Sequence, residues 1–173
     1  VYDAIIVDEG QDFQELWWLP LMALNDPDGT FYIFYDDNQR IYAEKHSWPI
    51  EATPIPLQEN VRSTKQIQEE VVKFYTSTCV PKVGDVDGRP VEFHFDVDEQ
   101  NLHQRLKEVL ENWVRKEKVS TEDIVILTPK SQKRSSLPAG QRLGRYRLTW
   151  DASEVGRNTV LVSTIHSFKG LES

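Results

Sequence analysis

The chain has 173 residues, a net charge of −8 and 39% hydrophobic residues, which is ordinary for a globular protein. No apolar run approaches the ~20 residues needed to span a bilayer, so we expect no membrane partner. The single Cys79 excludes an internal disulfide framework and a cysteine-based zinc site. It fits a reducing compartment, and we expect a cytoplasmic protein with one sizeable core or two small lobes.

Charge is distributed unevenly along the chain. Residues 1–56 contain 11 acidic and 2 basic side chains, whereas residues 57–173 contain 17 acidic and 18 basic ones. Residues 130–147, the basic segment, contain six basic residues and no acidic residue. This asymmetry predicts two lobes with different partners, and it argues against a protein that coats nucleic acid over its whole surface.

The first acidic cluster follows a short apolar run. Residues 4–7 predict a strand buried on both faces, and Asp8 and Glu9 come directly after it. Open α/β sheets bind ligands at the carboxyl ends of their strands. Successive side chains of an extended backbone point to opposite sides, so the two carboxylates suit different tasks, binding Mg²⁺ and activating a water. The alternative is a strand that ends in an ordinary polar turn.

A second strand is predicted in the same lobe. Residues 13–25 favour a helix that Pro20 must start or kink, and residues 25–29 have the composition of a turn. The apolar and aromatic run at residues 30–35 predicts another buried strand, which also ends in two carboxylates. Strand, helix and strand in this order predict a parallel sheet with its polar clusters at one edge.

The proline-containing residues 43–56 mark the predicted boundary between the lobes. The second lobe begins with a helix that Ser63 can cap, with Gln66 as its partner in a capping box. Residues 91–95 alternate like a strand, and residues 97–118 contain the clearest amphipathic helix. Further strands are predicted at residues 124–127, 147–150 and 159–163.

Four separated sequence blocks resemble the motifs of one family. They are DEGQD at residues 8–12, YDDNQRIY at 35–42, LQENVRST at 57–64 and VSTIHSFKGLE at 162–172. In this order they resemble motifs II, III, IV and V of the UvrD-like superfamily-one DNA helicases, the UvrD/Rep/PcrA group. The resemblance spans nearly the whole chain. It implies α/β architecture with two RecA-like P-loop NTPase lobes, residues 1–56 and 57–173, of which the first is incomplete.

The resemblance also implies ATP-driven movement on single-stranded DNA, with ATP and Mg²⁺ as cofactors and RNA as an alternative strand. Asp8 would hold Mg²⁺, Glu9 would be the base for the attacking water, and Gln39 would sense the γ-phosphate. Arg62 would act as an arginine finger from the second lobe, although taken alone it reads as a surface arginine. The other implied contacts are Gly170 and Glu172 to the nucleotide, and Thr164 and His166 to the strand.

Two departures from the family pattern bear on these roles. Motif III has Asp36 where the family has glycine, which puts the local turn geometry in question. A Walker A loop needs a Gly-Lys-Ser/Thr run, and no Gly-Lys pair occurs in the sequence. We therefore expect a fragment whose partners are the Walker A and motif VI segments of a longer parent chain. We also expect the isolated chain to hydrolyse ATP negligibly.

Two other functions stay open on the sequence alone. One is a degenerate module that binds nucleotide or DNA without turnover. The other is a stand-alone Mg²⁺-dependent phosphohydrolase that uses Asp8, Glu9, Asp36 and Asp37.

The basic segment also has two interpretations. Its cations, among them Lys133, Arg134 and Arg142, form a positive field that suits contact with a nucleic-acid backbone. Tyr146 and Trp150 would then offer stacking faces to unpaired bases. The serine, glycine and proline content of the same segment instead favours a mobile, solvated loop.

Overall fold

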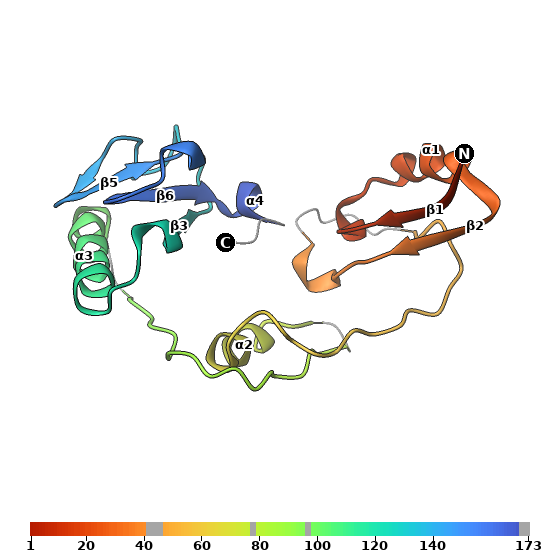
Figure 1. Cartoon of the computed structure of the whole chain (residues 1–173), viewed down its shortest axis with the longest axis horizontal. Helices are drawn as coiled ribbons and strands as arrows, with labels where there is room; N and C mark the ends of the chain where they lie inside the picture. The colour runs from red at the N-terminus through yellow and green to blue at the C-terminus, as the bar shows by residue number, and fades with distance from the viewer. Residues whose placement is uncertain (41–46, 77–78, 96–97, 170–173) are drawn as a thin grey trace. The chain divides into compact units, whose positions relative to one another are not determined.

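The computed structural model describes residues 1–40, 47–76, 79–95 and 98–169 (Figure 1). The chain divides into two compact units, Val1–Phe93 and His94–Ser173. Both contain helices and parallel strand pairs, so the predicted α/β class with parallel sheets is confirmed. The lobe boundary that the sequence predicts between residues 56 and 57 lies inside the first unit. The division into two RecA-like lobes at this point stays a prediction.

The first unit is built on a β-α-β arrangement. Strand β1 (Tyr2–Val7) leads through a short 3₁₀ turn, η1 (Gly10–Asp12), into helix α1 (Glu15–Leu24), and β2 (Asn25–Ile33) returns parallel to β1. The carboxyl ends of both strands therefore lie at the same edge, as the sequence predicts. Pro20 lies inside helix α1 and does not start it, so of the two predicted outcomes the start at Pro20 is wrong and the kink stays a prediction.

Strand β2 begins earlier than the sequence predicts. It starts at Asn25, in the segment expected to be a turn, and the pairing register shifts between Tyr2 and Ala4 of β1. The turn chemistry is still present, because the Asp28 N–H donates to Asp26 Oδ1 at 2.9 Å. An aspartate side chain that bonds to the backbone two residues ahead forms a local turn, which here interrupts the strand as an irregularity.

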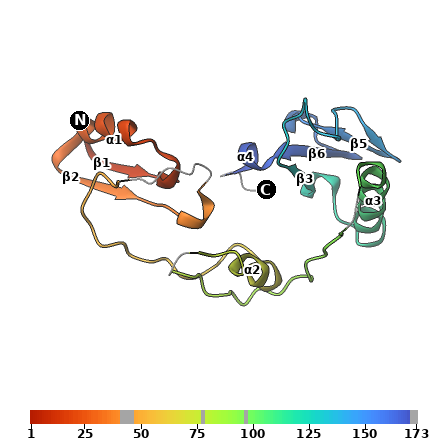
Figure 2. The same ribbon diagram turned by 180° about the vertical axis from the view of Figure 1, so that it is seen from behind.

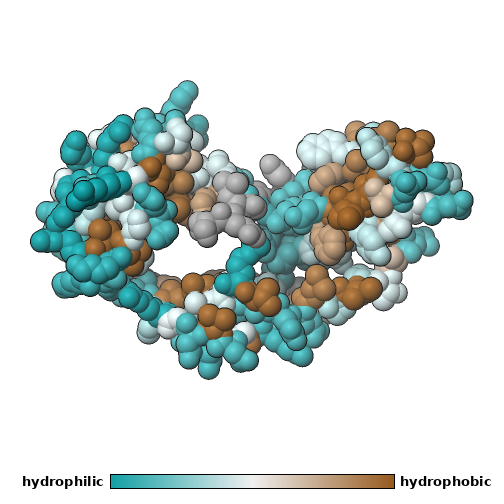
Figure 3. Space-filling model, viewed as in Figure 1, coloured by the Kyte–Doolittle hydropathy of each residue, from teal (hydrophilic) through white to brown (hydrophobic). Residues whose placement is uncertain are grey.

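The prediction that β1 and β2 are buried on both faces is wrong. Ile6 pairs with Tyr32, and these side chains are 67% and 57% exposed, while Val7 on the opposite face is buried. The described part of this unit has a sheet of two strands, and α1 lies along it (Figures 1 and 2). Figure 3 shows apolar surface over β1 and β2.

An aromatic cluster supports the edge of the sheet where the strands end. Phe13 stacks on the buried Trp18 at 4.9 Å between ring centroids, and Tyr35 packs on Trp48 at 4.4 Å. Trp18 and Trp48 meet edge to face at 6.1 Å. Aromatic pairs of this kind bury large areas, so they fix the chain segments that follow β1 and β2.

Helix α2 (Lys65–Val72) forms where the sequence predicts a helix, but it is not capped as expected. Its N-cap residue is Thr64, which makes no side-chain cap bond, and Gln66 Oε1 instead accepts from the Gly88 N–H at 2.7 Å. The strand predicted at residues 91–95 does not form. Alternation alone does not make a strand, because the backbone also needs a partner for its hydrogen bonds.

The second unit has a four-stranded sheet in the order β3-β6-β5-β4. Its strands are β3 (Val125–Thr128), β4 (Arg142–Leu143), β5 (Tyr146–Thr149) and β6 (Thr159–Thr164). Strands β3, β5 and β6 are parallel, and the short β4 is antiparallel to β5. The three longer strands were predicted from the sequence, whereas β4 is too short to give a periodic signal.

Helix α3 (Glu99–Glu111) packs on this sheet and continues into a π-helical turn, η3 (Asn112–Lys116) (Figure 2). The amphipathic helix expected within residues 97–118 is thereby confirmed for its described part. The apolar core of the described part of this unit consists of Leu110, Ile124, Leu137, Leu143, Tyr146, Leu148, Val160 and Val162.

Candidate functional site

The candidate site begins where β1 ends. Val7 is buried, Asp8 is exposed, and Glu9 adopts a left-handed backbone conformation with φ 52° and ψ 40°. Asp8 Oδ1 accepts from the Glu9 N–H at 2.9 Å, which caps the sharp turn. Left-handed conformations are uncommon for residues other than glycine, and they concentrate at functional sites and switch regions. The carboxylate that the sequence assigns as a base therefore sits on a strained turn.

Gly10 brings the ends of the two strands together. Its N–H donates to Phe34 O at 2.9 Å, and the Phe34 N–H donates to Val7 O at 2.8 Å. A Cβ atom at Gly10 would lie 2.5 Å from Ile33 Cγ2, closer than carbon atoms approach. The DEGQD block thus needs glycine at this position for close packing, which the sequence analysis missed although the glycine itself was visible.

Gln11 is a second residue that the sequence analysis did not single out. Its side chain is fully buried, with 0% exposure. Gln11 Nε2 donates to Glu9 Oε2 at 2.5 Å, and Gln11 Oε1 accepts from the Asp36 N–H at 3.1 Å. One amide side chain therefore joins the loop after β1 to the loop after β2.

The loop after β2 is organised by Asp36. Asp36 Oδ1 accepts from the Asn38 N–H and Asp36 Oδ2 accepts from Gln39 Nε2, both at 2.9 Å. Asp36 has φ −130°, an extended conformation open to any residue, so this position does not need glycine. Asp37 instead pairs with Arg40 at 2.6 Å. Gln39, the predicted γ-phosphate sensor, is thus connected to Glu9 through Asp36 and Gln11.

The segment after α2 also contacts this loop. The Tyr75 hydroxyl donates to Asp36 Oδ2 at 3.3 Å, and the Thr76 N–H donates to Asn38 Oδ1 at 2.8 Å. Burial raises the pKa of Tyr75, and the charge of Asp36 and the hydrogen bond to it raise that pKa further. The phenol therefore stays protonated and able to donate at neutral pH.

Arg62, the predicted arginine finger, lies on a turn before α2. Asn60 Oδ1 accepts from the backbone N–H groups of Arg62 at 3.2 Å and Ser63 at 3.1 Å. A Cβ atom at Gly84 would lie 2.5 Å from Asn60 O, so a neighbouring segment packs directly on this turn. The backbone at Arg62 is thereby held in place, while the position of its guanidinium relative to Glu9 stays a prediction.

In the second unit, the predicted strand-binding residues follow β6. Thr164 is the N-cap of the short helix α4 (Ile165–Phe168): its Oγ1 accepts from the Ser167 N–H at 2.9 Å. His166 is exposed. Thr164 therefore has a local structural role whether or not it touches a ligand. Gly170 and Glu172, predicted to contact nucleotide, lie outside the described residues.

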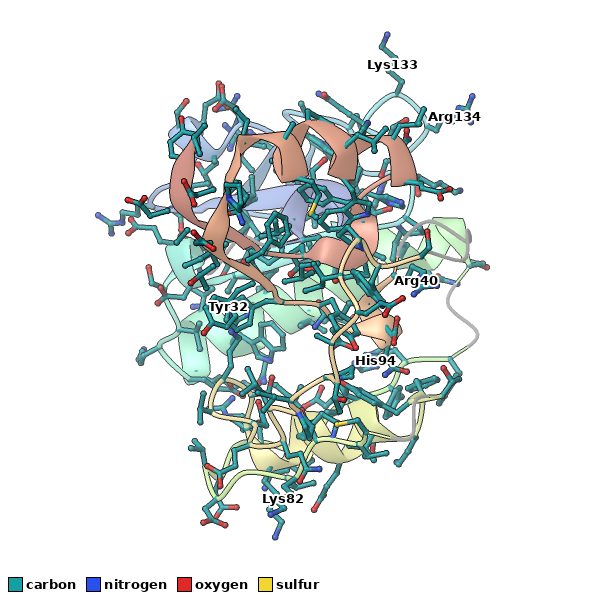
Figure 4. All side chains as sticks on the ribbon, turned by 90° about the vertical axis from the view of Figure 1, so that its right-hand side faces the viewer. Tyr32, Arg40, Lys82, His94, Lys133 and Arg134 are labelled. Carbon is teal, nitrogen blue, oxygen red and sulfur yellow. The ribbon has the colours of Figure 1, made fainter. Side chains whose placement is uncertain are left out.

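All six cations of the basic segment are exposed. Among the described residues, only Arg147 has an ion-pair partner, Glu154 at 3.1 Å. The tip of the segment is a turn at residues 131–134. The Arg134 N–H closes this turn by donating to Ser131 O at 2.9 Å. Figure 4 shows Lys133 and Arg134 pointing outward from this tip.

The base of the basic segment is anchored to the unit. Leu137 is buried, and its carbonyl accepts from Trp150 Nε1 at 2.9 Å. Ser136 O lies 2.6 Å from His103 Nε2, which must carry the proton because a carbonyl can only accept. Tyr146 has 0% exposure, so the prediction that it offers a stacking face to bases is wrong. Tyr146 is the first residue of β5, and its side chain points to the face of that strand that packs into the core.

The donor set near Glu9 is compatible with a single Mg²⁺ held mainly by water and phosphate. In the described ranges, no group of three or more His, Cys, Asp or Glu residues could hold a metal. Mg²⁺ in nucleotide sites needs only one or two carboxylates, because substrate phosphates and waters complete its shell. The exposed Asp8 fits that role, and Asp36 fits it less well because both of its oxygens accept internal hydrogen bonds.

Comparison of the chain with protein-family models, curated proteins and solved structures finds no match. Among the helices that the structure describes, none is long and apolar enough to cross a membrane.

Proposed function

We propose that the chain is part of an ATP-dependent motor that moves on single-stranded DNA, of the UvrD-like superfamily-one type with RecA-like lobes. The observation that carries this proposal is the bonded path from Glu9 through Gln11 and Asp36 to Gln39. The path joins Glu9 and Gln39 at the carboxyl edge of parallel strands, where α/β sheets bind ligands, and this supports the roles of base and phosphate sensor that we propose for them.

In this proposal Asp8 would hold Mg²⁺, which would supply positive charge to the nucleotide phosphates. Glu9 accepts a proton from the attacking water and orients that water toward the γ-phosphate. Gln39 contacts the γ-phosphate, and its hydrogen bond to Asp36 fixes its side chain. The phosphate-binding loop is supplied by the parent chain, outside these 173 residues, so the chain alone is expected to hydrolyse ATP negligibly.

Arg62 supplies positive charge to the transition state in the same proposal. Such a residue contributes about 10³- to 10⁵-fold to the rate in other phosphoryl-transfer enzymes. Its turn is rigidly built, since Asn60 accepts two backbone hydrogen bonds there. Gly170 and Glu172 would complete the nucleotide contacts, and Thr164, His166 and the tip of the basic segment would contact the DNA strand, or an RNA strand in its place.

The test is ATP hydrolysis by the parent protein with and without single-stranded DNA. We expect DNA to stimulate hydrolysis and Arg62→Ala to lower kcat by at least about 10³-fold. Arg89→Ala, which removes another exposed arginine of the first unit, is the matched control and should stay within about twofold. Equal rates for the two variants, or a parent without a Walker A lysine, would contradict the proposal and favour a binding module without turnover.

A stand-alone phosphohydrolase is less well supported by the geometry. It would need the motif III aspartates as metal ligands, but Asp37 pairs with Arg40 and Asp36 accepts internal hydrogen bonds on both oxygens. Robust turnover by the isolated chain, lost on Glu9→Gln, would reverse this preference.

A further inference from the structure

Gln11 has a chemical role that its two neighbours define. A carboxylate such as Glu9 can only accept hydrogen bonds, and the backbone N–H of Asp36 can only donate one. The bridging side chain must therefore offer a donor and an acceptor at once. The Gln11 amide does so, with Nε2 at 2.5 Å from Glu9 Oε2 and Oε1 at 3.1 Å from the Asp36 nitrogen.

The burial of Gln11 makes this bridge costly to remove. The side chain has 0% exposure, so water cannot replace either hydrogen bond without local opening. Glu9 also stands in a left-handed conformation, which is uncommon for this residue type and has to be maintained by its surroundings. Gln11 bonds directly to the carboxylate that this turn presents.

We propose that Gln11 is a positioning residue for ATP hydrolysis, which holds the Glu9 carboxylate and ties it to the loop that carries Gln39. This inference rests on the proposed function. It predicts that a change in the Asp36 loop, where Gln39 meets the nucleotide, is transmitted to Glu9 through a single amide. Gln11 itself would not contact ATP.

Two substitutions separate positioning from simple structural support. Gln11→Glu keeps an oxygen that can accept from the Asp36 N–H, but in its ionised form it has no hydrogen to donate to Glu9 and places a second carboxylate beside it. Gln11→Leu removes both bonds. If Gln11 only staples the loops together, Gln11→Glu should behave like the wild type. If it positions Glu9, both variants should lose activity.

The experiment measures kcat and KM for DNA-stimulated ATP hydrolysis by the parent protein. We expect both Gln11 variants to lower kcat by about 10- to 100-fold with KM within about twofold, since a hydrogen bond to a charged group is lost. Gln68→Leu is the matched control, because Gln68 is another buried glutamine of the first unit. It should retain at least half of the wild-type kcat.

Hydrogen exchange on the 173-residue chain provides a second readout that needs no hydrolysis. The Asp36 amide should be protected in the wild type and in Gln11→Glu, and it should exchange about tenfold faster in Gln11→Leu. Wild-type kcat in Gln11→Glu, or an unprotected Asp36 amide in the wild type, would overturn the positioning role. A wild-type parent without DNA-stimulated hydrolysis would overturn the proposed function and this role together, so the two failures are distinguishable.

Discussion

Glu9 combines a functional side chain with an unfavourable backbone. Its φ of 52° is a conformation that costs L-residues about 1–2 kcal/mol relative to the right-handed one. The turn at Glu9 directs the chain from β1 into η1, where Gly10 and Gln11 are buried. The sequence pointed to the carboxylate from the end of the apolar run, but no periodic pattern indicates a left-handed residue.

A comparison of two small residues tests this strain directly. Glu9→Gly is expected to be more stable than Glu9→Ala by about 1 kcal/mol, because glycine adopts positive φ without a Cβ clash. Both substitutions remove the same hydrogen bond from Gln11, so their difference isolates the backbone. Urea denaturation of the chain, followed by circular dichroism, gives the free energies of unfolding.

Glu69 provides the opposite control. It is exposed within α2, where alanine should be more stable than glycine by about 1 kcal/mol. Alanine being the more stable residue at both positions would contradict a left-handed conformation at Glu9.

Gln11 and Gly10 show why residue-scale roles are hard to predict from one sequence. The bridge of Gln11 depends on the backbone of Asp36, which is 25 positions away, and on the parallel pairing that brings the two loops together. The need for glycine at position 10 arises from Ile33 on the other strand. The polar residues at the ends of the strands could be predicted from the sequence. The contacts between the two loops could be identified only from the three-dimensional structure.

At the scale of elements, the β-α-β order of the first unit followed from sequence patterns. The apolar runs predicted strands and the parallel pairing, but they also predicted burial on both faces, which Ile6 and Tyr32 contradict. A continuous apolar run indicates that both faces of a strand could be buried. It does not indicate whether another element covers each face, and among the described residues the face with Ile6 and Tyr32 is exposed. The strand predicted at residues 91–95 was wrong for a related reason, because an alternating sequence pattern does not by itself provide a strand to pair with.

The close approach of the two strand ends can be tested at Gly10. Gly10→Ala is expected to lower the free energy of unfolding by about 1–3 kcal/mol, because the new methyl group would overlap Ile33 Cγ2. Gly156→Ala is the control, since a Cβ atom there meets nothing within 4 Å, and it should change stability by no more than about 0.5 kcal/mol. A Gly10→Ala variant as stable as the wild type would show that the strand ends are farther apart.

The basic segment is held at its base by buried and hydrogen-bonded residues and has an exposed tip. Its anchors at Leu137 and Ser136 explain how a sequence rich in serine and glycine is held to the core. Sequence composition could not reveal these anchors, because they depend on Trp150 and His103 from other elements. Both anchors leave the cations at the tip free to meet a ligand.

Salt dependence of binding to single-stranded DNA tests the tip. Replacing Lys133 and Arg134 by alanine in the parent protein should reduce the slope of log K against log salt by about 1.4, at about 0.7 for each phosphate that is no longer neutralised. The matched control replaces the adjacent exposed pair Arg115 and Lys116 of η3, and its slope should not change. Unchanged affinity and slope in the tip variant would leave the segment without a nucleic-acid role.

At the scale of the whole molecule, the two compact units divide the predicted motifs unequally. The blocks that resemble motifs II, III and IV fall within Val1–Phe93, and the block that resembles motif V falls within His94–Ser173. The sequence predicts a lobe boundary at the proline-containing stretch, and within the first unit Tyr75 and Thr76, which follow α2, bond to the Asp36 loop. Composition indicates where a chain bends, whereas contacts decide which segments pack together.

The proposed motor needs Glu9 as the base for ATP hydrolysis, so the most direct measurement compares two glutamate-to-glutamine variants of the parent protein. Glu9→Gln should lower DNA-stimulated hydrolysis by at least about 10³-fold while ATP still binds, because glutamine cannot accept the proton from water. Glu15→Gln, an exposed glutamate in the first turn of α1, should hydrolyse ATP at the wild-type rate. Hydrolysis by Glu9→Gln within tenfold of the wild type would contradict the account.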